Sequence, residues 1–356
     1  MIAAEVLRWV IGMALVAYVV TGGADFGAGV WDLLARGRGA ERERALIADA
    51  IAPIWEANHI WIILVVVLAF TGFPVAFAVV ATALHIPIAM ALVGIVLRGA
   101  AFTFRAYGLQ RSDLRARWGW VFAWSSLITP VCLGLVVGGM SSGEIVVEDG
   151  AVRSGYVAGW TSAFAIGVGV FTLLCMVMLA AVYLAADLDD GDDELREAYR
   201  GRAIVCELLT GVAAAGVAGL AAWQVPTLWT NLVRGGTALL VHGGAFTAAS
   251  LTLWALVTRR FAVARWTAAA QVAAVVIGWG VAMDGALVLG AVDLGNAGVV
   301  AEVVAPVLWT LAAGGLLLGP AMWWLMRVFK LQQNGDPASA GGRRDASETA
   351  EPPDPA

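Results

Sequence analysis

The chain of 356 residues has little charge, because charged residues make up 14% of it and apolar residues 60%. Soluble domains carry about 25% charged residues, so this chain lacks the polar residues that would cover a water-exposed surface. The net charge is -5, which leaves no excess of positive charge for a nucleic acid. We therefore predict a membrane protein and exclude nucleic-acid binding.

The sequence is also poor in residues that hold metals or form disulfides, with three cysteines and three histidines. The acidic stretch 187–194 lacks the calcium-loop spacing, because Leu188 and Ala186 stand three and five residues before Gly191, where that loop needs acids or amides. No nucleotide-binding glycine motif or zinc-protease motif is present. We predict no metal site, and we interpret the cysteines as packing residues: Cys132, Cys175 and Cys206.

Long apolar stretches account for most of the chain, and a helix needs about 20 such residues to cross a bilayer. The apolar stretch 51–97 is too long for one span, and Pro74 supplies a break because proline cannot donate a backbone hydrogen bond. The predicted fold is all-α, a nine-helix transmembrane domain over 1–330 with a disordered tail over 331–356. The predicted spans are 6–23, 51–73, 74–97, 119–140, 157–186, 203–223, 236–257, 261–283 and 303–326.

Basic residues are distributed unevenly over the loops that these nine spans define. All but three of the 22 lysines and arginines fall on one side, and the three exceptions are Arg8, Arg153 and Arg234. Basic loops stay in the cytoplasm, so we predict an outside N-terminus and a cytoplasmic C-terminus. The N-terminus lacks a basic region and a cleavage site, so we expect the first helix to be retained.

Ionisable groups in the first three predicted spans are the main functional candidates. Asp25 follows the first span, Glu56 and His59 share one face of the second, and Arg98 ends the third. Such groups are costly in a membrane and usually face the bundle interior or a water-filled path. They indicate either a route for cytoplasmic protons or a structural ion pair of Arg98 with Asp25 or Glu56, and the sequence favours neither. Gly23 and Gly27 suit close helix packing.

Other polar residues in the spans are weaker candidates. His85 and His242 could ligate haem or relay protons, but the histidines are not paired in the sequence, and we favour polar packing. Glu207 is a further proton-path candidate or an interfacial acid. The 16 tryptophans are typical of interfacial anchors, although their faces could also hold a quinone ring.

Four segments in the first 105 residues resemble subunit II of the cytochrome bd-type quinol oxidases. They are TGGADFGAG at 21–29, IAPIWEANHIW at 51–61, FPVAFA at 73–78 and GIVLRGAAFTFR at 94–105. Many members of that family have Asp in place of Glu56. Some members also carry an acid between two tryptophans, where this chain has Gly119 between Trp118 and Trp120. A proton path shared with those members would lack this acid here.

The resemblance implies an enzyme complex with an obligate partner, subunit I, in a prokaryotic cytoplasmic membrane. Subunit I would hold haem b and haem d, or a third haem b, oxidise quinol and reduce dioxygen to water. This chain would bind no haem and carry no catalytic residue, and its cofactor-binding residues stay unknown. It would contact lipid, and a small accessory subunit could bind to it. On the same resemblance the proton-pathway residues are Asp25, Glu56, His59, Arg98 and Asn58.

Two other classes of protein also place acids inside spans. A secondary transporter predicts inverted repeats and broken helices that meet at mid-membrane. A purely structural scaffold predicts that Asp25→Asn and Glu56→Gln leave oxygen consumption unchanged.

Overall fold

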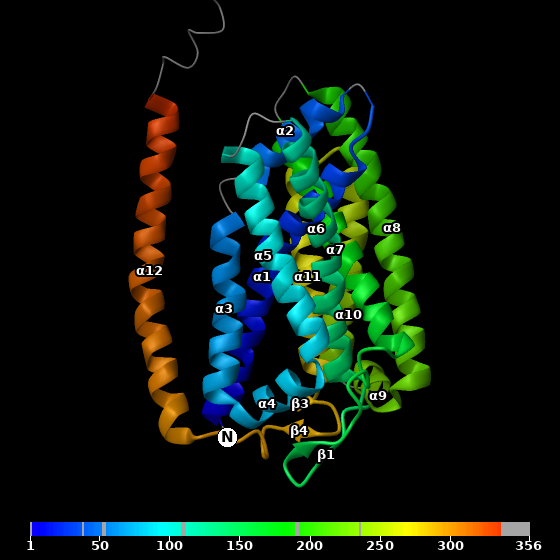
Figure 1. The fold of residues 1–356 in the computed structure, drawn as a ribbon, viewed down its shortest axis with the longest axis vertical. Coiled ribbons are helices and arrows are strands. Elements are labelled where there is room, and N and C mark those ends of the chain that lie inside the picture. The colour runs from blue at the N-terminus through cyan, green and yellow to red at the C-terminus, as the bar shows by residue number, and fades with distance from the viewer. Residues whose placement is uncertain are drawn as a thin grey trace, which may run out of the picture. The chain divides into compact units, whose positions relative to one another are not determined.

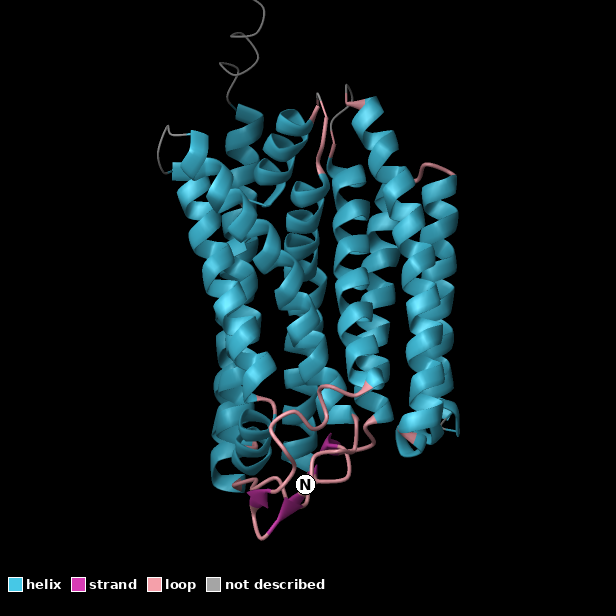
Figure 2. Cartoon of the chain, turned by 45° about the vertical axis from the view of Figure 1, so that its right-hand side comes forward, coloured by secondary structure: helices cyan, strands magenta, loops and turns pink. Residues whose placement is uncertain are grey.

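The computed structural model describes residues 2–37, 39–51, 55–107, 112–188, 192–234 and 236–335. The chain forms two compact units, residues 1–301 and residues 302–356. The first unit is a bundle of long helices with two short antiparallel hairpins (Figure 1). Figure 2 shows that both hairpins lie beyond the same ends of these helices, where the N-terminus also lies.

The elements of the first unit follow the chain in this order. They are α1 Ile2–Leu34, α2 Ala40–Ile51, α3 Trp55–Gly72, α4 Pro74–Ala83, α5 His85–Tyr107, α6 Ser112–Ser141, β1 Val147–Glu148, β2 Ala151–Val152, α7 Ala163–Asp187, α8 Asp193–Gln224, α9 Pro226–Arg234, α10 Gly236–Val257, α11 Phe261–Ala282, β3 Ala286–Val288 and β4 Val292–Asp293. The second unit contains α12, which is Ala301–Gly335.

Within the described residues, seven helices are long and apolar enough to cross a membrane: α1, α5, α6, α7, α8, α10 and α11. The bent pair α3 and α4 passes the same test when the two are taken together, which raises the number to eight. The chain is therefore an all-α, multi-pass membrane protein. The predicted count of nine and the predicted orientation stay predictions, and α12 contributes a shorter apolar stretch, Glu302–Leu317.

Helices α1 and α8 are among those that are longer than the sequence predicted. Helix α1 continues to Leu34 and does not end at Gly23. Helix α8 begins at Asp193, ten residues before the predicted start at Ala203. In both cases the prediction stopped at charged residues, whereas the fold gives many of these residues partners and the helix continues through them.

The predicted third span was wrong at its start. Phe73 lies outside the helical region and Pro74 begins the short helix α4, which is bent by 119° from α3. A second break at Leu84 precedes α5, so this span begins at His85. Helix α4 packs against the β3–β4 hairpin, and the Val75 amide donates to the Ala297 carbonyl at 3.2 Å.

Smaller differences occur at other helix ends. Helix α7 begins at Ala163, later than the predicted 157, because Ser162 caps it by accepting from the Ala165 amide. Helix α6 begins earlier than predicted, at Ser112. Helix α10 has the predicted bounds, and α11 ends one residue early.

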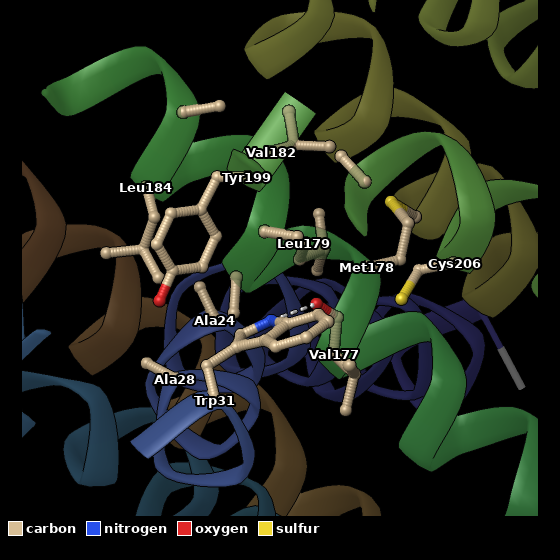
Figure 3. Packing of buried hydrophobic residues seen from close by; sticks show 14 of the residues in the cluster. Ala24, Ala28, Trp31, Val177, Met178, Leu179, Val182, Leu184, Tyr199 and Cys206 are labelled. Carbon is tan, nitrogen blue, oxygen red and sulfur yellow. Dashed lines mark hydrogen bonds between the residues drawn. The ribbon is translucent and has the colours of Figure 1, made fainter. Parts of the chain in front are cut away.

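Helix α7 is the central element of the first unit, because it contacts α1, α6, α8 and α11. Its residues from Cys175 to Val182 are all buried, and they form the core with residues of α1 and α8 (Figure 3). The Trp31 indole of α1 donates to the Val177 carbonyl of α7 at 3.1 Å. An indole with this partner satisfies its polar group inside the apolar core.

Helix α12, taken by itself, runs from Ala301 to Gly335 and contains Pro306 and Pro320. It includes the first five residues of the predicted tail. The rest of that tail, residues 336–356, lies outside the described residues.

Candidate functional site

The buried polar site of this chain is an ion pair between α1 and α5. Arg98 donates from Nη1 to Asp25 Oδ2 at 2.9 Å and from Nη2 to Asp25 Oδ1 at 2.5 Å. Nη2 also donates to the Asp25 backbone carbonyl at 2.9 Å. The exposed fractions of the two side chains are 1% for Arg98 and 0% for Asp25. This bidentate geometry is the strongest form of an arginine–carboxylate pair.

Helix α6 completes the set of partners for the arginine. Arg98 Nε donates to Ser126 Oγ at 3.1 Å, and Ser126 Oγ donates in turn to the Phe122 carbonyl at 2.7 Å. The rings of Phe26 and Phe122 lie with their centroids 4.9 and 5.0 Å from the guanidinium carbon. Every nitrogen of the guanidinium therefore has an acceptor, and two aromatic rings contact the cation.

Glycines allow the helices to come close enough to form this pair. A Cβ on Gly27 would lie 2.0 Å from the Met176 carbonyl oxygen of α7, and one on Gly29 would lie 2.2 Å from Ser126 Oγ. A Cβ on Gly23 would also meet Met176, at 3.2 Å. The close helix packing predicted for Gly23 and Gly27 is therefore confirmed, and it brings α1 against α7.

Asn58 and His59 lie at the start of α3, next to α1. Asn58 is buried, and its side-chain amide donates to the Thr21 carbonyl at 3.4 Å, one helical turn before Asp25. The His59 ring lies edge-on to Tyr18 and Phe26, with centroids 6.5 and 6.4 Å away. The Tyr18 hydroxyl is buried and has no hydrogen-bond partner among the described residues. These residues extend the polar region from the ion pair toward α3.

The structure places the predicted site residues as follows. Asp25 and Arg98 form an ion pair, which is one of the two pairings that the sequence left open. Asn58 and His59 contact residues of α1. The side chain of Glu56 lies outside the described residues.

Two predicted depths need correction. Asp25 was expected at the end of the first span and Arg98 at the end of the third, but each lies nine residues before the end of its helix, at Leu34 and Tyr107. Nine residues of helix correspond to about 14 Å. Both residues therefore lie inside their helices and not at the helix ends.

The sequence reasoning missed Ser126, Tyr18 and the two phenylalanines. Ser125 and Ser126 interrupt an apolar run of α6, and that interruption was the available signal for a polar contact. Nothing in the sequence marks Tyr18, Phe26 or Phe122 among the other aromatic residues, because their role depends on which helices meet.

The other histidines lie in different surroundings. His85 is the first residue of α5, whereas the predicted span 74–97 would place it eleven residues after the start of a helix. Its Nδ1 is 2.8 Å from the Thr82 carbonyl, and its ring is edge-on to Tyr156. His242 Nδ1 is 2.6 Å from the Ala238 carbonyl on its own helix, α10. Each makes the polar packing contacts that we favoured over a ligand role.

Within the part of the chain that the structure describes, no group of three or more His, Cys, Asp or Glu could hold a metal ion. Residues 189–191 of the acidic stretch lie outside the described residues. Asp187 pairs with Arg265 and Asp192 pairs with Arg42, so two acids of that stretch bind arginines.

An apolar groove of about 560 Å³ lies along α5 and α6. Its lining includes Met90, Leu97, Trp120 and Trp124, and Ser125 is the polar residue in it. Such a lining suits a hydrocarbon chain and supplies no charged group for chemistry.

A comparison with protein families matches residues 3–329 to the model for cytochrome bd terminal oxidase subunit II. The cytochrome bd-I ubiquinol oxidase subunit 2 of Escherichia coli K12 is 26% identical over 192 residues, which are 52% of this chain and 50% of that protein. The cytochrome bd ubiquinol oxidase subunit 2 of Bacillus subtilis is 27% identical over 203 residues, which are 56% and 59% of the two chains. The chain thus spans about half the length of the curated relatives it matches.

The fold is also similar to a solved structure, that of the bd oxidase from Geobacillus thermodenitrificans. The TM-score is 0.77 at 23% identity, and the match covers 92% of this chain and 99% of that one. At this identity the likeness concerns the fold, and it extends over both halves of the chain.

Proposed function

The chain belongs to the cytochrome bd terminal oxidase subunit II family, and we propose that it is the haem-free subunit of a quinol oxidase in a prokaryotic cytoplasmic membrane. Its partner would be subunit I, which would hold haem b with haem d or a third haem b. The complex would oxidise quinol and reduce dioxygen to water. This chain would stabilise subunit I and help bring cytoplasmic protons to it.

The observation that carries this proposal is the buried Asp25–Arg98 pair. Two opposite charges inside a membrane bundle are costly to desolvate, and an apolar pair of similar size is often as stable or more stable. We therefore propose that the pair has a role beyond helix packing and that it belongs to a polar route through α1, α3 and α5.

The proposed route begins at α3 and ends at α1. Glu56 and His59 would receive protons near the start of α3, on the side predicted to be cytoplasmic. Asn58 would hold water along the contact of α3 with α1, and Asp25 would be the inner acid. Arg98 would position the Asp25 carboxylate, since it donates to both carboxylate oxygens.

The chemistry of the proposed reaction gives such a route a purpose. Reduction of dioxygen to two waters consumes four protons, and quinol oxidation releases protons at the site where quinol binds. If the consumed protons come from the cytoplasm and the released ones leave outside, the reaction separates charge across the membrane. The residues of this chain would hold and pass protons, and the redox steps belong to the partner.

The test uses the intact complex with subunit I, in liposomes. We expect Asp25→Asn to lower quinol-driven oxygen consumption and proton uptake at least tenfold while haem content stays that of the wild type. Since this change leaves Arg98 without its counter-ion, His59→Phe is the second variant, because a phenyl ring suits the contacts with Tyr18 and Phe26. We expect His59→Phe to lower both rates with normal assembly.

Glu148→Gln is the matched control, because Glu148 is exposed in β1, outside the helices. It should leave both rates unchanged. Normal rates in a fully assembled His59→Phe or Asp25→Asn complex would show that the site is only structural. A purified chain that binds a solute and never copurifies with haem would instead identify a transporter.

A further inference from the structure

A further buried acid, Glu207, lies in the middle of α8, and its hydrogen-bond partner, Gln271, lies in the middle of α11. Glu207 is 14 residues after the start of α8 at Asp193, and Gln271 is ten residues after the start of α11 at Phe261. The exposed fractions are 5% for Glu207 and 7% for Gln271. Their neighbours on the outer face of α8 are about half exposed or more, as expected for residues that face lipid: Leu208, Leu209 and Val212.

The two side chains share one hydrogen bond and leave three polar atoms without partners. Gln271 Nε2 donates to Glu207 Oε1 at 2.9 Å. Glu207 Oε2, Gln271 Oε1 and Thr210 Oγ1 are buried and lack a hydrogen-bond partner among the described residues. Thr210 is one helical turn after Glu207 and is 2% exposed, so it lies on the same buried face.

No cation neutralises Glu207 among the described residues, where the ion pairs of nearby helices use other acids. On α8, Arg202 pairs with Glu43, and on α11, Arg265 pairs with Asp187. The groups that interact electrostatically with Glu207 are the thiols of Cys175 and Cys206, which are buried.

The remaining titratable groups on the helices packed around α8 are also accounted for. Helix α7 carries Tyr183 next to Arg265, and α9 carries Arg234 in its last turn. Helix α10 carries His242, which faces Gly278, seven residues beyond Gln271 on α11. The acids and arginines of α8 itself, apart from Glu207, lie between Asp193 and Arg202, toward its start.

A proton on the acid balances the hydrogen-bonding atoms of the Glu207 and Gln271 side chains. As a carboxylate, Glu207 would present an unpartnered acceptor beside a second unpartnered acceptor, the carbonyl oxygen of Gln271. A proton on Oε2 turns that atom into a donor. Glu207 Oε1 and Gln271 Nε2 already share a hydrogen bond. The two atoms that remain, Glu207 Oε2 and Gln271 Oε1, belong to the same two side chains. An uncompensated charge at this depth would also be costly.

We propose that Glu207 is a proton-binding site, in which its carboxylic acid on α8 exchanges two hydrogen bonds with the Gln271 amide on α11. The amide nitrogen donates to the acid carbonyl, and the acid hydroxyl donates to the amide carbonyl. The ligand is a hydrogen ion. This site is separate from the Asp25–Arg98 pair and does not depend on the route proposed above.

Infrared spectroscopy of the intact complex in detergent tests this proposal, since it detects the carbonyl stretch of a protonated carboxylic acid without turnover. At neutral pH we expect one such band that disappears in Glu207→Gln and persists, shifted, in Glu207→Asp. Gln271→Leu should move the band to higher frequency, because it removes the partner of the acid. Transfer to D₂O should lower the band's frequency as the proton exchanges.

Glu194→Gln is the matched control on the same helix, because Glu194 is exposed in the first turn of α8. It should leave the band unchanged. Identical wild-type and Glu207→Gln spectra at neutral pH would overturn the proposal, because Glu207 would then be ionised. Loss of the band on adding sodium ions would also overturn it, because the oxygens would then form a cation site.

Discussion

Two of the buried acids of this chain, Asp25 and Glu207, have opposite surroundings. Asp25 accepts from two nitrogens of Arg98, and the third guanidinium nitrogen donates to Ser126. Glu207 has the neutral amide of Gln271 as its hydrogen-bond partner and keeps one oxygen without a partner among the described residues. Both side chains are nearly inaccessible to solvent. The difference is one of charge compensation: Arg98 faces Asp25, whereas no cation among the described residues pairs with Glu207.

The comparison also concerns packing around the two acids. Near Asp25 the helices approach so closely that Gly27 and Gly29 have no room for a Cβ. Near Glu207, Gly211 has no heavy atom within 4 Å of a built Cβ. The ion pair therefore lies in a tightly fitted contact between helices, whereas Gly211, four residues after Glu207, is an exposed and open position on α8. Substitutions near Asp25 or near Glu207 should therefore have different effects on stability.

The largest effect is expected from Arg98→Met, which leaves the Asp25 carboxylate buried without a cation. Breaking a buried pair in this way costs about 3–5 kcal/mol. Thermal unfolding of the purified complex should show the loss as a lower midpoint. The double variant Asp25→Leu with Arg98→Met should recover most of the stability, because no uncompensated charge remains. Equal losses in the single and double variants would contradict this account.

Ser126→Ala should have the next largest effect. It removes the acceptor for Arg98 Nε, and a hydrogen bond to a charged group is worth about 1.5–3 kcal/mol. Ser125→Ala is the matched control, because Ser125 is also buried but donates to carbonyls of its own helix. The unfolding midpoint should fall further for Ser126→Ala than for Ser125→Ala. The reverse order would show that Ser126 contributes little to the pair.

Gly27→Ala should destabilise the contact of α1 with α7. The new Cβ would lie 2.0 Å from the Met176 carbonyl oxygen, and such overpacking costs about 1–3 kcal/mol. The control Gly211→Ala should be neutral or stabilise α8, because that position is open and alanine has the higher helix propensity. Unfolding midpoints of both variants give the comparison. An unchanged unfolding midpoint in Gly27→Ala would mean that α1 and α7 can move apart at little cost.

The smallest effect is expected from Thr210→Val, with a change within about 1 kcal/mol and no loss of stability. The Thr210 hydroxyl is buried without a partner among the described residues, so its removal ends a desolvation cost. Thr252→Val is the control, because Thr252 Oγ1 donates to the Ala248 carbonyl and contacts Thr267 Oγ1 at 2.9 Å. Thr252→Val should be the more destabilising of the two. A clear loss in Thr210→Val would show that its hydroxyl has a strong partner.

Much of the bundle follows from local pattern. The apolar runs of α10 and α11 predicted their bounds almost to the residue, because long apolar stretches flanked by polar residues leave few alternatives. The errors occurred where charge lies inside a helix, as at Asp25 in α1 and at the start of α8. A hydropathy pattern ends a span at such residues, since it has no information about the partner that compensates the charge.

The site was predictable as a set of residues and not as a set of contacts. Asp25, Asn58, His59 and Arg98 were all identified, yet whether Arg98 binds Asp25 or Glu56 could not be decided from spacing. Gln271 was not identified at all, because an isolated glutamine in an apolar run has no significance until the residue facing it is known. Pro74 predicted a break, but the second break at Leu84 depends on the packing of α4 against the β3–β4 hairpin.

The sequence alone determined that this chain is a helical membrane protein, where most helices lie, and which charged groups are unusual. These properties depend on residue composition and on the length of apolar runs, which are local. The tertiary structure decided that Asp25 is paired, that Ser126 completes the arginine's partners and that Glu207 faces an amide. Those facts depend on which helices come into contact, and a cation's distance from an acid decides whether the acid remains charged.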